Sequence, residues 1–277
     1  MAKNVETIPF SFGSNFRTLV KHYVDDEHIA EAEKALAEFL LLPHLRGKTF
    51  LDIGSGHGFA SLAAFRLGAE KILSVDKDPA SVECTQELWR LAGSPVSWQM
   101  RQGSVLDIEF VKSLGTFDIV HSWGVLHHTG AMWEAIQNAA TRVRSGGLLH
   151  IAIYNKADVW GIYPDGRFGT SSFWRIEKKI YSSLPLFLQT IIDYVVAGIL
   201  IVGYLLTLQN PIRKIREHKR YRGMVWFVDI KDWLGGYPYE AATVEEIFRF
   251  VKKLGFTLEN LKTNNGLMNN EYLFRKF

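Results

Sequence analysis

The stretch Leu51–Gly58, with the sequence LDIGSGHG, holds residue types suited to binding a ligand with the main chain. An acid, Asp52, precedes three alternating glycines at the point where a strand-like apolar run gives way to a helical pattern. These glycines are Gly54, Gly56 and Gly58. Glycine lets a ligand approach the backbone and permits unusual dihedral angles, and the first turn of a helix offers free N–H donors. The stretch therefore predicts a ligand-binding turn.

Two familiar glycine-rich loops do not fit this stretch. A dinucleotide fingerprint, Gly-x-Gly-x-x-Gly, counted from Gly54 would place its third glycine at Phe59. A phosphate-binding loop would need Gly-Lys-Ser or Gly-Lys-Thr, and neither follows. What remains is the pattern Asp-x-Gly-x-Gly-x-Gly.

Two adjacent histidines, His127 and His128, follow the apolar run 117–122. Ligands of open α/β sheets bind at the carboxyl ends of the strands, so both histidines are candidate catalytic residues. An imidazole titrates near neutral pH and is suited to taking a proton from a substrate hydroxyl or amine. The alternative, that either histidine packs or hydrogen-bonds structurally, stays open. Adjacent histidines lack the i, i+4 spacing of helical metal ligands, and we expect no metal site.

Other polar and aromatic residues are candidates for substrate binding. Tyr154 and Asn155 end the apolar run 148–154 at the same sheet edge. The segment 224–240 combines acids and aromatics with a Gly-Gly pair, typical of a loop that covers a site and binds a cationic or ring-shaped substrate. Its candidates are Asp229, Trp233 and Tyr237. Residues 10–16 would add a second wall to the site. The alternative, that segment 224–240 simply packs the helical insertion onto the sheet, stays open.

Strand and helix patterns alternate from position 48 to 155, which favours a parallel sheet covered on both faces. We expect an α/β fold, Rossmann-like, with a seven-stranded, mostly parallel sheet. Apolar positions at helical spacing predict one more helix over 27–42. The expected layout is an N-terminal helical extension (1–47), a cofactor-binding core (48–155), a helical insertion or lid (156–242), and a closing helix and strands (243–277).

The Asp-x-Gly-x-Gly-x-Gly pattern resembles the first motif of class I S-adenosylmethionine-dependent methyltransferases. The resemblance extends over about 48–155 through the stretches 75–78 (VDKD), 103–107 (GSVLD) and 117–120 (FDIV), and the closing strands match too. The Leu-His-His-Thr-Gly stretch is similar to that of quinone-biosynthesis and small-molecule methyltransferases. The resemblance implies a Rossmann-like methyltransferase that uses S-adenosyl-L-methionine as its cofactor.

The resemblance assigns roles to individual residues. The glycines would let the methionine moiety pass over the loop, and Asp52 would supply negative charge near its ammonium and sulfonium groups. Asp76 would accept hydrogen bonds from both ribose hydroxyls, because a carboxylate has two acceptor oxygens. Ser104 stands where related proteins often carry an acid that meets the adenine amine, so the Val105 backbone or Asp107 would replace it. The remaining cofactor candidates are Lys77, His121 and Trp123, whose ring would stack on the cofactor or lie in the core.

The segment 184–208 is apolar on nearly every face, and Asp193 is its only charge. Such a helix is buried in protein or contacts lipid. Its charge-free part, 194–208, would rise only about 22 Å, which disfavours a full span of a core of about 30 Å. The basic run 212–222 follows at once and would meet anionic headgroups. A lid, a dimer contact in a homo-oligomer, and peripheral membrane contact through 184–222 stay open.

The composition excludes several classes of chain. With 47% hydrophobic and 22% charged residues, the chain is not disordered. Cys84 is the only cysteine, which excludes a disulfide framework and fits a reducing compartment. A net charge of +3 on 32 basic and 29 acidic residues is too balanced to indicate nucleic-acid binding, and we expect no nucleic-acid partner. The N-terminal residues lack the apolar region of a secretory signal, so we expect a cytoplasmic location.

The resemblance thus implies an enzyme that moves a methyl group to an O, N, S or C nucleophile of a small organic metabolite. The apolar segment supports an alternative, a lipophilic quinone or polyprenyl-type substrate at the membrane surface. A protein that binds S-adenosylmethionine without transferring its methyl group stays open as another class. Macromolecular substrates are not favoured. Methyltransferases that modify exposed amines of bases and glutamines carry a motif of the Asn-Pro-Pro-Tyr type after the fourth strand, and this chain has the sequence SWGV there.

Overall fold

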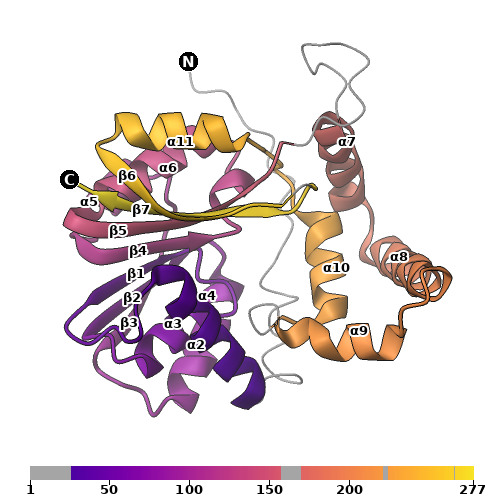
Figure 1. Cartoon of the computed structure of the whole chain (residues 1–277), viewed down its shortest axis with the longest axis horizontal. Coiled ribbons are helices and arrows are strands. Elements are labelled where there is room, and N and C mark those ends of the chain that lie inside the picture. Colours follow the sequence, from indigo (N-terminus) through magenta and orange to yellow (C-terminus); the bar gives the residue numbers. More distant parts are fainter. Residues whose placement is uncertain (1–25, 157–169, 221–223, 265) are drawn as a thin grey trace.

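The structure is a computed structural model that describes residues 26–156, 170–220, 224–264 and 266–277. The expected wall over residues 10–16 and the start of the N-terminal extension lie outside these residues. In the described part of the chain, seven strands form one sheet in the order β3-β2-β1-β4-β5-β7-β6 (Figure 1). The strands are β1 (Thr49–Ile53), β2 (Lys71–Asp76), β3 (Trp98–Gln102), β4 (Phe117–Trp123), β5 (Val143–Tyr154), β6 (Phe256–Lys262) and β7 (Asn269–Lys276).

The pairing of the strands confirms the expected fold. All pairs from β3 to β5 are parallel, and β7 runs antiparallel to both β5 and β6. The order reverses between β1 and β4, the kind of switch point where open α/β sheets bind their ligands. The carboxyl ends of β1, β2 and β4 therefore meet beside that switch point.

Helices cover both faces of the sheet, since successive side chains of a strand point to opposite faces. Phe50 packs into the apolar cluster formed with α2 (Asp26–Leu40) and α3 (Phe59–Arg66), whereas Leu51 packs into the cluster formed with α6 (Met132–Thr141) and α11 (Val244–Lys253). In Figure 1 these two pairs of helices lie below and above the sheet. The expected helix 27–42 is α2, which buries Ile29, Ala32, Leu36, Phe39 and Leu40 against the sheet.

Helix starts show why the chain turns where it does. Asp78 accepts a hydrogen bond from the amide of Ala80 (2.9 Å) and so caps α4 (Pro79–Leu91). Asp107 caps α5 (Ile108–Lys112), a five-residue helix that the sequence pattern did not predict. Thr243 and Glu246 form a reciprocal capping box at the start of α11.

Between β5 and α11 lies a group of helices that packs beside the sheet rather than over it (Figure 1). They are α7 (Thr170–Ser183), α8 (Leu186–Leu206), α9 (Pro211–Glu217), the 3-10 turn η2 (His218–Arg220) and α10 (Trp226–Gly235). Their shared apolar cluster includes Tyr181, Ala197, Trp226 and Leu234. The Tyr181 hydroxyl donates to the Asp193 carboxylate at 2.5 Å, and both side chains are buried. The only charge of the apolar segment 184–208 thus faces protein.

Candidate functional site

The turn between β1 and α3 needs its glycines. Gly54, Gly56 and Gly58 all have positive φ angles, 76°, 54° and 87°, a region that residues with a Cβ atom rarely adopt. A Cβ atom on Gly54 would overlap both γ carbons of Val125 and lie 2.8 Å from its Cβ atom. A Cβ atom on Gly58 would lie 3.0 Å from the Cα atom of Thr85. The turn is therefore a bare backbone surface enclosed by the loop after β4 and by α4.

Asp76 holds this turn from the end of β2. Its carboxylate accepts hydrogen bonds from the amides of Gly56 and Asp78, each at 2.9 Å. Burial raises the pKa of Asp76 to about 6, and the amide hydrogen bonds from Gly56 and Asp78 oppose that rise. The side chain is only partly buried and keeps lone pairs for further donors. The bare glycine turn and this carboxylate fit a ligand with an extended chain and a pair of hydroxyl groups, as S-adenosylmethionine has.

Asp52 lies on the sheet face covered by α2 and α3 and is buried. The Ser61 hydroxyl donates to its carboxylate at 2.6 Å and also lies 2.6 Å from the Ser74 hydroxyl. The Trp98 indole donates to Ser74 at 2.8 Å. This network places the Asp52 carboxyl group under the glycine turn, and the expected contact of Asp52 with the cofactor stays a prediction.

The candidates for the adenine side surround the turn before α5. The Ser104 hydroxyl accepts from the amide of Leu106 (3.2 Å), and the Val105 carbonyl accepts from the Asn138 amide (2.9 Å). The Asp107 carboxylate caps α5, so the structure gives it a helix-capping role. Lys77 is exposed beside Asp76, and Trp123 ends β4 half-buried. Their contacts with a cofactor remain predictions.

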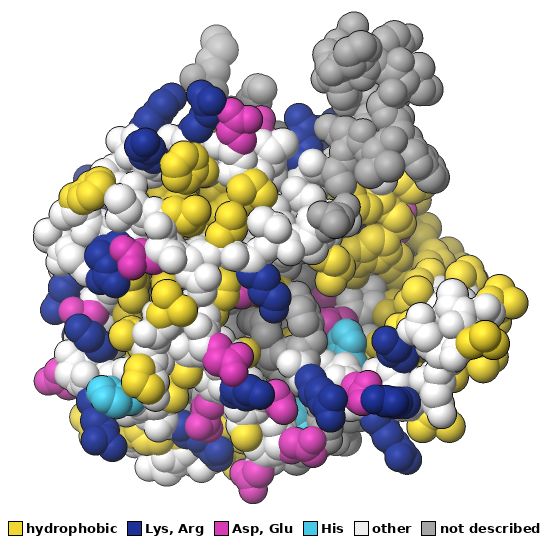
Figure 2. Space-filling view, viewed as in Figure 1, with side chains coloured by type: hydrophobic (Ala, Val, Ile, Leu, Met, Phe, Trp, Pro, Cys, Tyr) yellow, Lys and Arg dark blue, Asp and Glu magenta, His cyan; other side chains and the backbone are white. Residues whose placement is uncertain are grey.

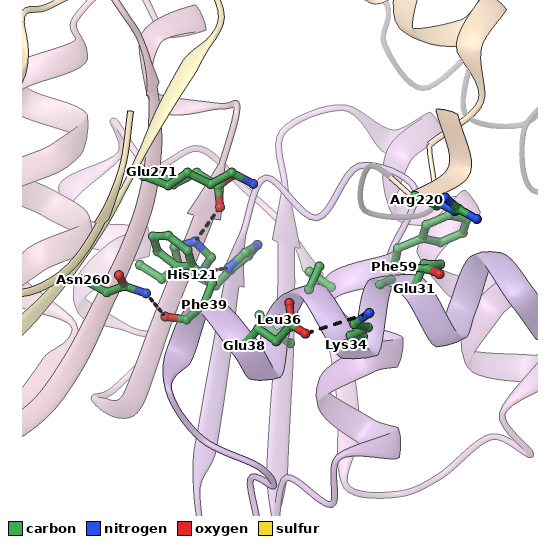
Figure 3. A pocket seen from close by; sticks show the side chains of 15 residues that line it. Glu31, Lys34, Leu36, Glu38, Phe39, Phe59, His121, Arg220, Asn260 and Glu271 are labelled. Carbon is green, nitrogen blue, oxygen red and sulfur yellow. Dashed lines mark hydrogen bonds and ion pairs between the residues drawn. The ribbon is translucent and has the colours of Figure 1, made fainter. Parts of the chain in front are cut away.

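His121 pairs with Asp52 across β4 and β1 and lies on the side of the sheet that faces α2. It borders a cavity of about 690 Å³ together with Glu271, Phe39 and Arg220 of η2 (Figure 3). Its Nδ1 atom lies 3.0 Å from Nδ1 of His150, and His150 Nε2 lies 3.7 Å from the Glu271 carboxylate. His121 is thus part of a buried polar cluster, and its expected contact with the cofactor stays a prediction. Among the described residues, no group of three His, Cys, Asp or Glu side chains is arranged to hold a metal ion.

A second cluster lies at the ends of β4 and β5 and includes both candidate catalytic histidines, on the turn η1 (Leu126–His128). The His127 ring is buried, 4.0 Å from the Tyr154 ring, and its Nδ1 atom lies 3.3 Å from the amide of Tyr154. His128 Nδ1 donates a hydrogen bond to the Pro238 carbonyl at 2.8 Å. Burial lowers the pKa of His127 well below its usual value and that of His128 to about 4. Both rings are neutral at pH 7.

The insertion covers this cluster with residues that the sequence did not indicate. Lys178 of α7 is buried among the rings of Trp233, Tyr239 and Tyr154, with Nζ at 5.0, 5.5 and 5.9 Å from their centroids. Trp233 therefore lies in this cluster, and its role in substrate binding stays a prediction. In the loop 236–243 the residue whose ring contacts Tyr154 is Tyr239, with the ring centroids 5.2 Å apart, whereas the candidate that the sequence indicated in this loop is Tyr237. The sequence did hold a signal for Lys178. It lies three positions before Tyr181, on the same face of the amphipathic helix α7, where an apolar residue would be expected.

Three of the expected substrate residues do not join this cluster through any contact that we observe. The Asn155 amide group donates to the carbonyls of Asn264 and Gly266 and accepts from the Asn270 amide, which ties β5 to the β6–β7 turn. Asp229 lies 2.7 Å from His218 Nε2, between α10 and η2. Tyr237 is half-buried and precedes Pro238. Their roles in substrate binding stay predictions.

Comparison with known proteins defines the class. Residues 51–151 match the family model described as a methyltransferase domain. The chain is 32% identical over 109 residues to a tRNA U34 carboxymethyltransferase of Idiomarina loihiensis, which covers 39% of this chain and 33% of that protein. It is 33% identical over 113 residues to a ubiquinone biosynthesis O-methyltransferase of a Methylobacterium species, covering 40% and 43%. The chain thus matches less than half the length of these relatives.

The fold is shared more widely. A magnesium protoporphyrin IX methyltransferase of Synechocystis with bound S-adenosylhomocysteine has a TM-score of 0.54 at 12% identity, covering 96% of this chain and 95% of that one. Together with the domain match, this confirms the expected class and its cofactor: the chain contains a methyltransferase domain of the class I, S-adenosylmethionine-dependent type.

The expectation that nucleic acid plays no part was wrong. Several of the curated relatives that match part of this chain are tRNA U34 carboxymethyltransferases. The balanced charge of the whole chain was a poor guide, because the acceptor of a methyltransferase meets only a local surface. Net charge therefore does not separate nucleic-acid acceptors from others here.

Proposed function

We propose that this protein transfers the methyl group of S-adenosylmethionine to a lipophilic organic acceptor at the surface of an anionic membrane. The observation that carries the proposal is the exposed apolar surface of the insertion, whose helices also cover the His127–Tyr154 cluster. We favour this acceptor over a small soluble metabolite, since a soluble acceptor leaves that surface without a role.

The apolar surface is formed by α7 and α8. The helix α8 is long and apolar enough to cross a membrane, with a mean hydropathy of 2.0 over its best window, of which only 11% is buried. Figure 2 shows hydrophobic side chains gathered where α7 and α8 lie. Those more than half exposed are Phe173, Ile176, Ile180, Leu186, Phe187, Ile191, Tyr194, Val195, Ile199, Val202, Leu205 and Leu206. Soluble monomers rarely expose so many adjacent large apolar side chains.

The helix α8 lies along the molecule and is packed against it on one side. Asp193 and Ala197 face Tyr181 and Trp226, while the opposite side faces outward. A helix with one protein-bound side and one apolar side suits the boundary between headgroups and acyl chains. This arrangement supports peripheral contact through one face of α8 rather than a free span.

The charges next to this surface favour lipid over a second copy of the chain. The helix α9 carries Arg213, Lys214 and Arg216, all exposed, and Arg220 follows in η2. In a symmetric dimer the same patch of both copies meets, so these cations would approach one another. An anionic membrane attracts them instead, with about 1 kcal/mol for each basic residue near the surface.

Different residues of this chain bind the cofactor and align the acceptor. The glycine turn and Asp76 hold S-adenosylmethionine, which supplies an electrophilic methyl group on its sulfonium centre. Val125, packed over Gly54, links that turn to His127 and Tyr154, so the acceptor cluster begins at the next residues along the chain. Alignment of the acceptor then supplies much of the rate. A general-base role for His127 or His128 stays a prediction.

A nucleic-acid acceptor is the second candidate, favoured by the names of the tRNA U34 carboxymethyltransferases that match part of this chain. The matches to these two proteins cover only 33% and 41% of their lengths. The exposed cations of α9 would serve a phosphate backbone as well as lipid headgroups.

An acceptor screen tests the proposal. Tritiated S-adenosylmethionine is incubated with the protein and with lipid, soluble small-molecule and RNA fractions, and labelled products are identified by mass spectrometry. We expect label in the lipid fraction, with S-adenosylhomocysteine formed only when acceptor is present. Label only in the RNA or the soluble fraction would replace the lipophilic acceptor, and no transfer with tight cofactor binding would indicate a binding protein.

Vesicle co-sedimentation tests the surface itself. The variant Val195→Ser/Ile199→Ser/Val202→Ser removes exposed apolar area from α8, and Leu91→Ser/Val96→Ser is a matched control at exposed apolar sites of the core. We expect salt-sensitive binding to anionic vesicles that only the α8 variant loses. Equal binding of both variants, or none by the wild type, contradicts membrane contact through α8.

A further inference from the structure

Lys178 is a buried amine that finds no hydrogen-bond partner among the described residues. Its side chain on α7 is 1% exposed, and Nζ makes no hydrogen bond to the described residues. The rings of Trp233, Tyr239 and Tyr154 surround it at 5.0–5.9 Å. A charged ammonium carries three donors, and burying them unpaired is costly. Ring faces offset part of that cost, but they supply no lone-pair acceptor for the three N–H donors.

The charged groups around Lys178 leave its protonation adjustable. Burial lowers the pKa of its ammonium from the usual lysine value, and the carboxylates of Glu177 on α7 and Asp232 on α10 oppose this. Burial also raises the pKa of Glu177 to about 7, so that carboxylate is only partly charged at neutral pH. His127 and His128 face the amine from η1 as neutral rings. The other titratable groups facing it are the phenols of Tyr154 and Tyr239.

Lys178 lies on the acceptor side of the cofactor turn. Val125 packs on Gly54, and the turn η1 follows at once with His127. The His127 ring contacts the Tyr154 ring at 4.0 Å, and the Tyr154 ring faces Lys178. An unbroken chain of contacts therefore joins the glycine turn to the amine.

We propose that Lys178 is the catalytic base of this methyltransferase and takes the proton of an acidic hydroxyl on a flat ring of the acceptor. The three aromatic side chains around Nζ can pack against such a ring. The hydroxyl oxygen of the acceptor then provides the hydrogen-bond partner that the Lys178 amine lacks among the described residues. This inference rests on the proposed methyl transfer and narrows its acceptor to a phenol or enol.

The step balances as follows. The acceptor O–H bond breaks, its proton bonds to the lone pair of Lys178 Nζ, and the electron pair stays on oxygen. That oxygen attacks the methyl carbon, so a C–O bond forms while the C–S bond breaks and its pair goes to sulfur. The products are a methyl ether, S-adenosylhomocysteine and a lysine ammonium, which later releases its proton to water.

Amine labelling tests the state of Lys178 without any acceptor. The folded protein reacts briefly with acetic anhydride over a pH series, with and without anionic vesicles, and peptide mass spectrometry follows Lys178 and its exposed neighbour Lys179. We expect Lys178 to be labelled in at least one condition, with a midpoint below about 10.4, the ordinary lysine value. Lys178 unlabelled in both conditions while Lys179 reacts, or labelled with an ordinary midpoint, overturns the proposal.

Two substitutions separate a base from a buried cation. Lys178→Met removes the amine at similar length, Lys178→Arg keeps the charge but cannot accept a proton at working pH, and Lys179→Met is the control. With the acceptor found in the screen, we expect both Lys178 variants to lose about 10²- to 10⁴-fold in turnover. Their melting temperature and affinity for S-adenosylhomocysteine check that fold and cofactor site survive.

The outcomes distinguish the two proposals. If Lys178→Arg or Lys178→Met keeps near-normal turnover on a lipophilic acceptor, the base is not Lys178 while the proposed function stands. If the screen finds no lipophilic acceptor, the proposed function fails, and the labelling series still decides whether Lys178 is a reactive amine.

Discussion

The contact between Gly54 and Val125 joins the cofactor turn to the acceptor side, and substitution of Gly54 by alanine tests it. An alanine at φ 76° costs about 1–2 kcal/mol for the left-handed backbone. Its Cβ atom would lie 2.8 Å from the Val125 Cβ atom and overlap both γ carbons, and such overpacking costs about 1–3 kcal/mol. We expect Gly54→Ala to lower the free energy of unfolding by about 2–5 kcal/mol.

A second glycine separates the two contributions. Gly47 also has a positive φ, 69°, but a Cβ atom there meets nothing within 4 Å. Gly47→Ala should therefore show the backbone cost alone, about 1–2 kcal/mol, and leave affinity for S-adenosylhomocysteine unchanged. Gly54→Ala should weaken that affinity, because the displaced loop narrows the turn.

A double-mutant cycle identifies Val125 as the cause. Val125→Ala removes the γ carbons, so Gly54→Ala/Val125→Ala should recover about 1–3 kcal/mol relative to the sum of the single variants. Urea unfolding gives the free energies, and calorimetry gives the affinity. Additivity within about 0.5 kcal/mol would refute the proposed steric contact.

Three further predictions concern single polar groups. Asp76→Asn should weaken S-adenosylhomocysteine binding by about ten- to hundredfold in calorimetry, since bonds to a charged acceptor are worth roughly 1.5–3 kcal/mol. The pKa of Asp76 rises on folding from 3.8 to about 6. The folded state therefore binds the proton more tightly, and the contribution of Asp76 to stability falls as pH rises from 3.8 to about 6. Over the same pH range the carboxylate becomes charged, so the affinity of the wild type for S-adenosylhomocysteine should rise. An affinity that does not change over this range would contradict the role of Asp76 in binding the ribose hydroxyls. Tyr181→Phe should cost about 1–3 kcal/mol in urea unfolding, because buried Asp193 loses its donor. Thr243→Ala should cost about 0.5–2 kcal/mol through loss of the capping box, with cofactor affinity unchanged; a loss of affinity would place α11 in the cofactor site.

Much of the core could be predicted because its signals are local. The turn from β1 into α3 is short and needs positive φ angles, which glycine adopts readily. Gly54, Gly56 and Gly58 all have such angles and lie within five residues of one another. Asp76 at the end of the next strand lies at the same sheet edge because parallel strands present their carboxyl ends together. Short-range periodicity likewise indicated α2 and the strands.

Pairing between distant residues could not be predicted in this way. The direction in which His121 points depends on the parity of β4, and that strand turns it toward α2 and His150. The hydrogen bonds of the Asn155 amide group to a turn more than a hundred positions later could not be predicted from the sequence either. Composition also failed for the partner, because net charge averages over surfaces that no acceptor touches.

The sequence by itself determined the class of protein, through a motif whose glycines and acid lie within one strand, one turn and the next strand end. It also determined that 184–208 is apolar and that a basic run follows. Only the tertiary structure decided which side of α8 faces outward, since Tyr181 pairs with Asp193 across two helices. The tertiary structure alone brought Lys178 to Tyr154 and His127, because burial of an amine depends on what the folded chain places around it.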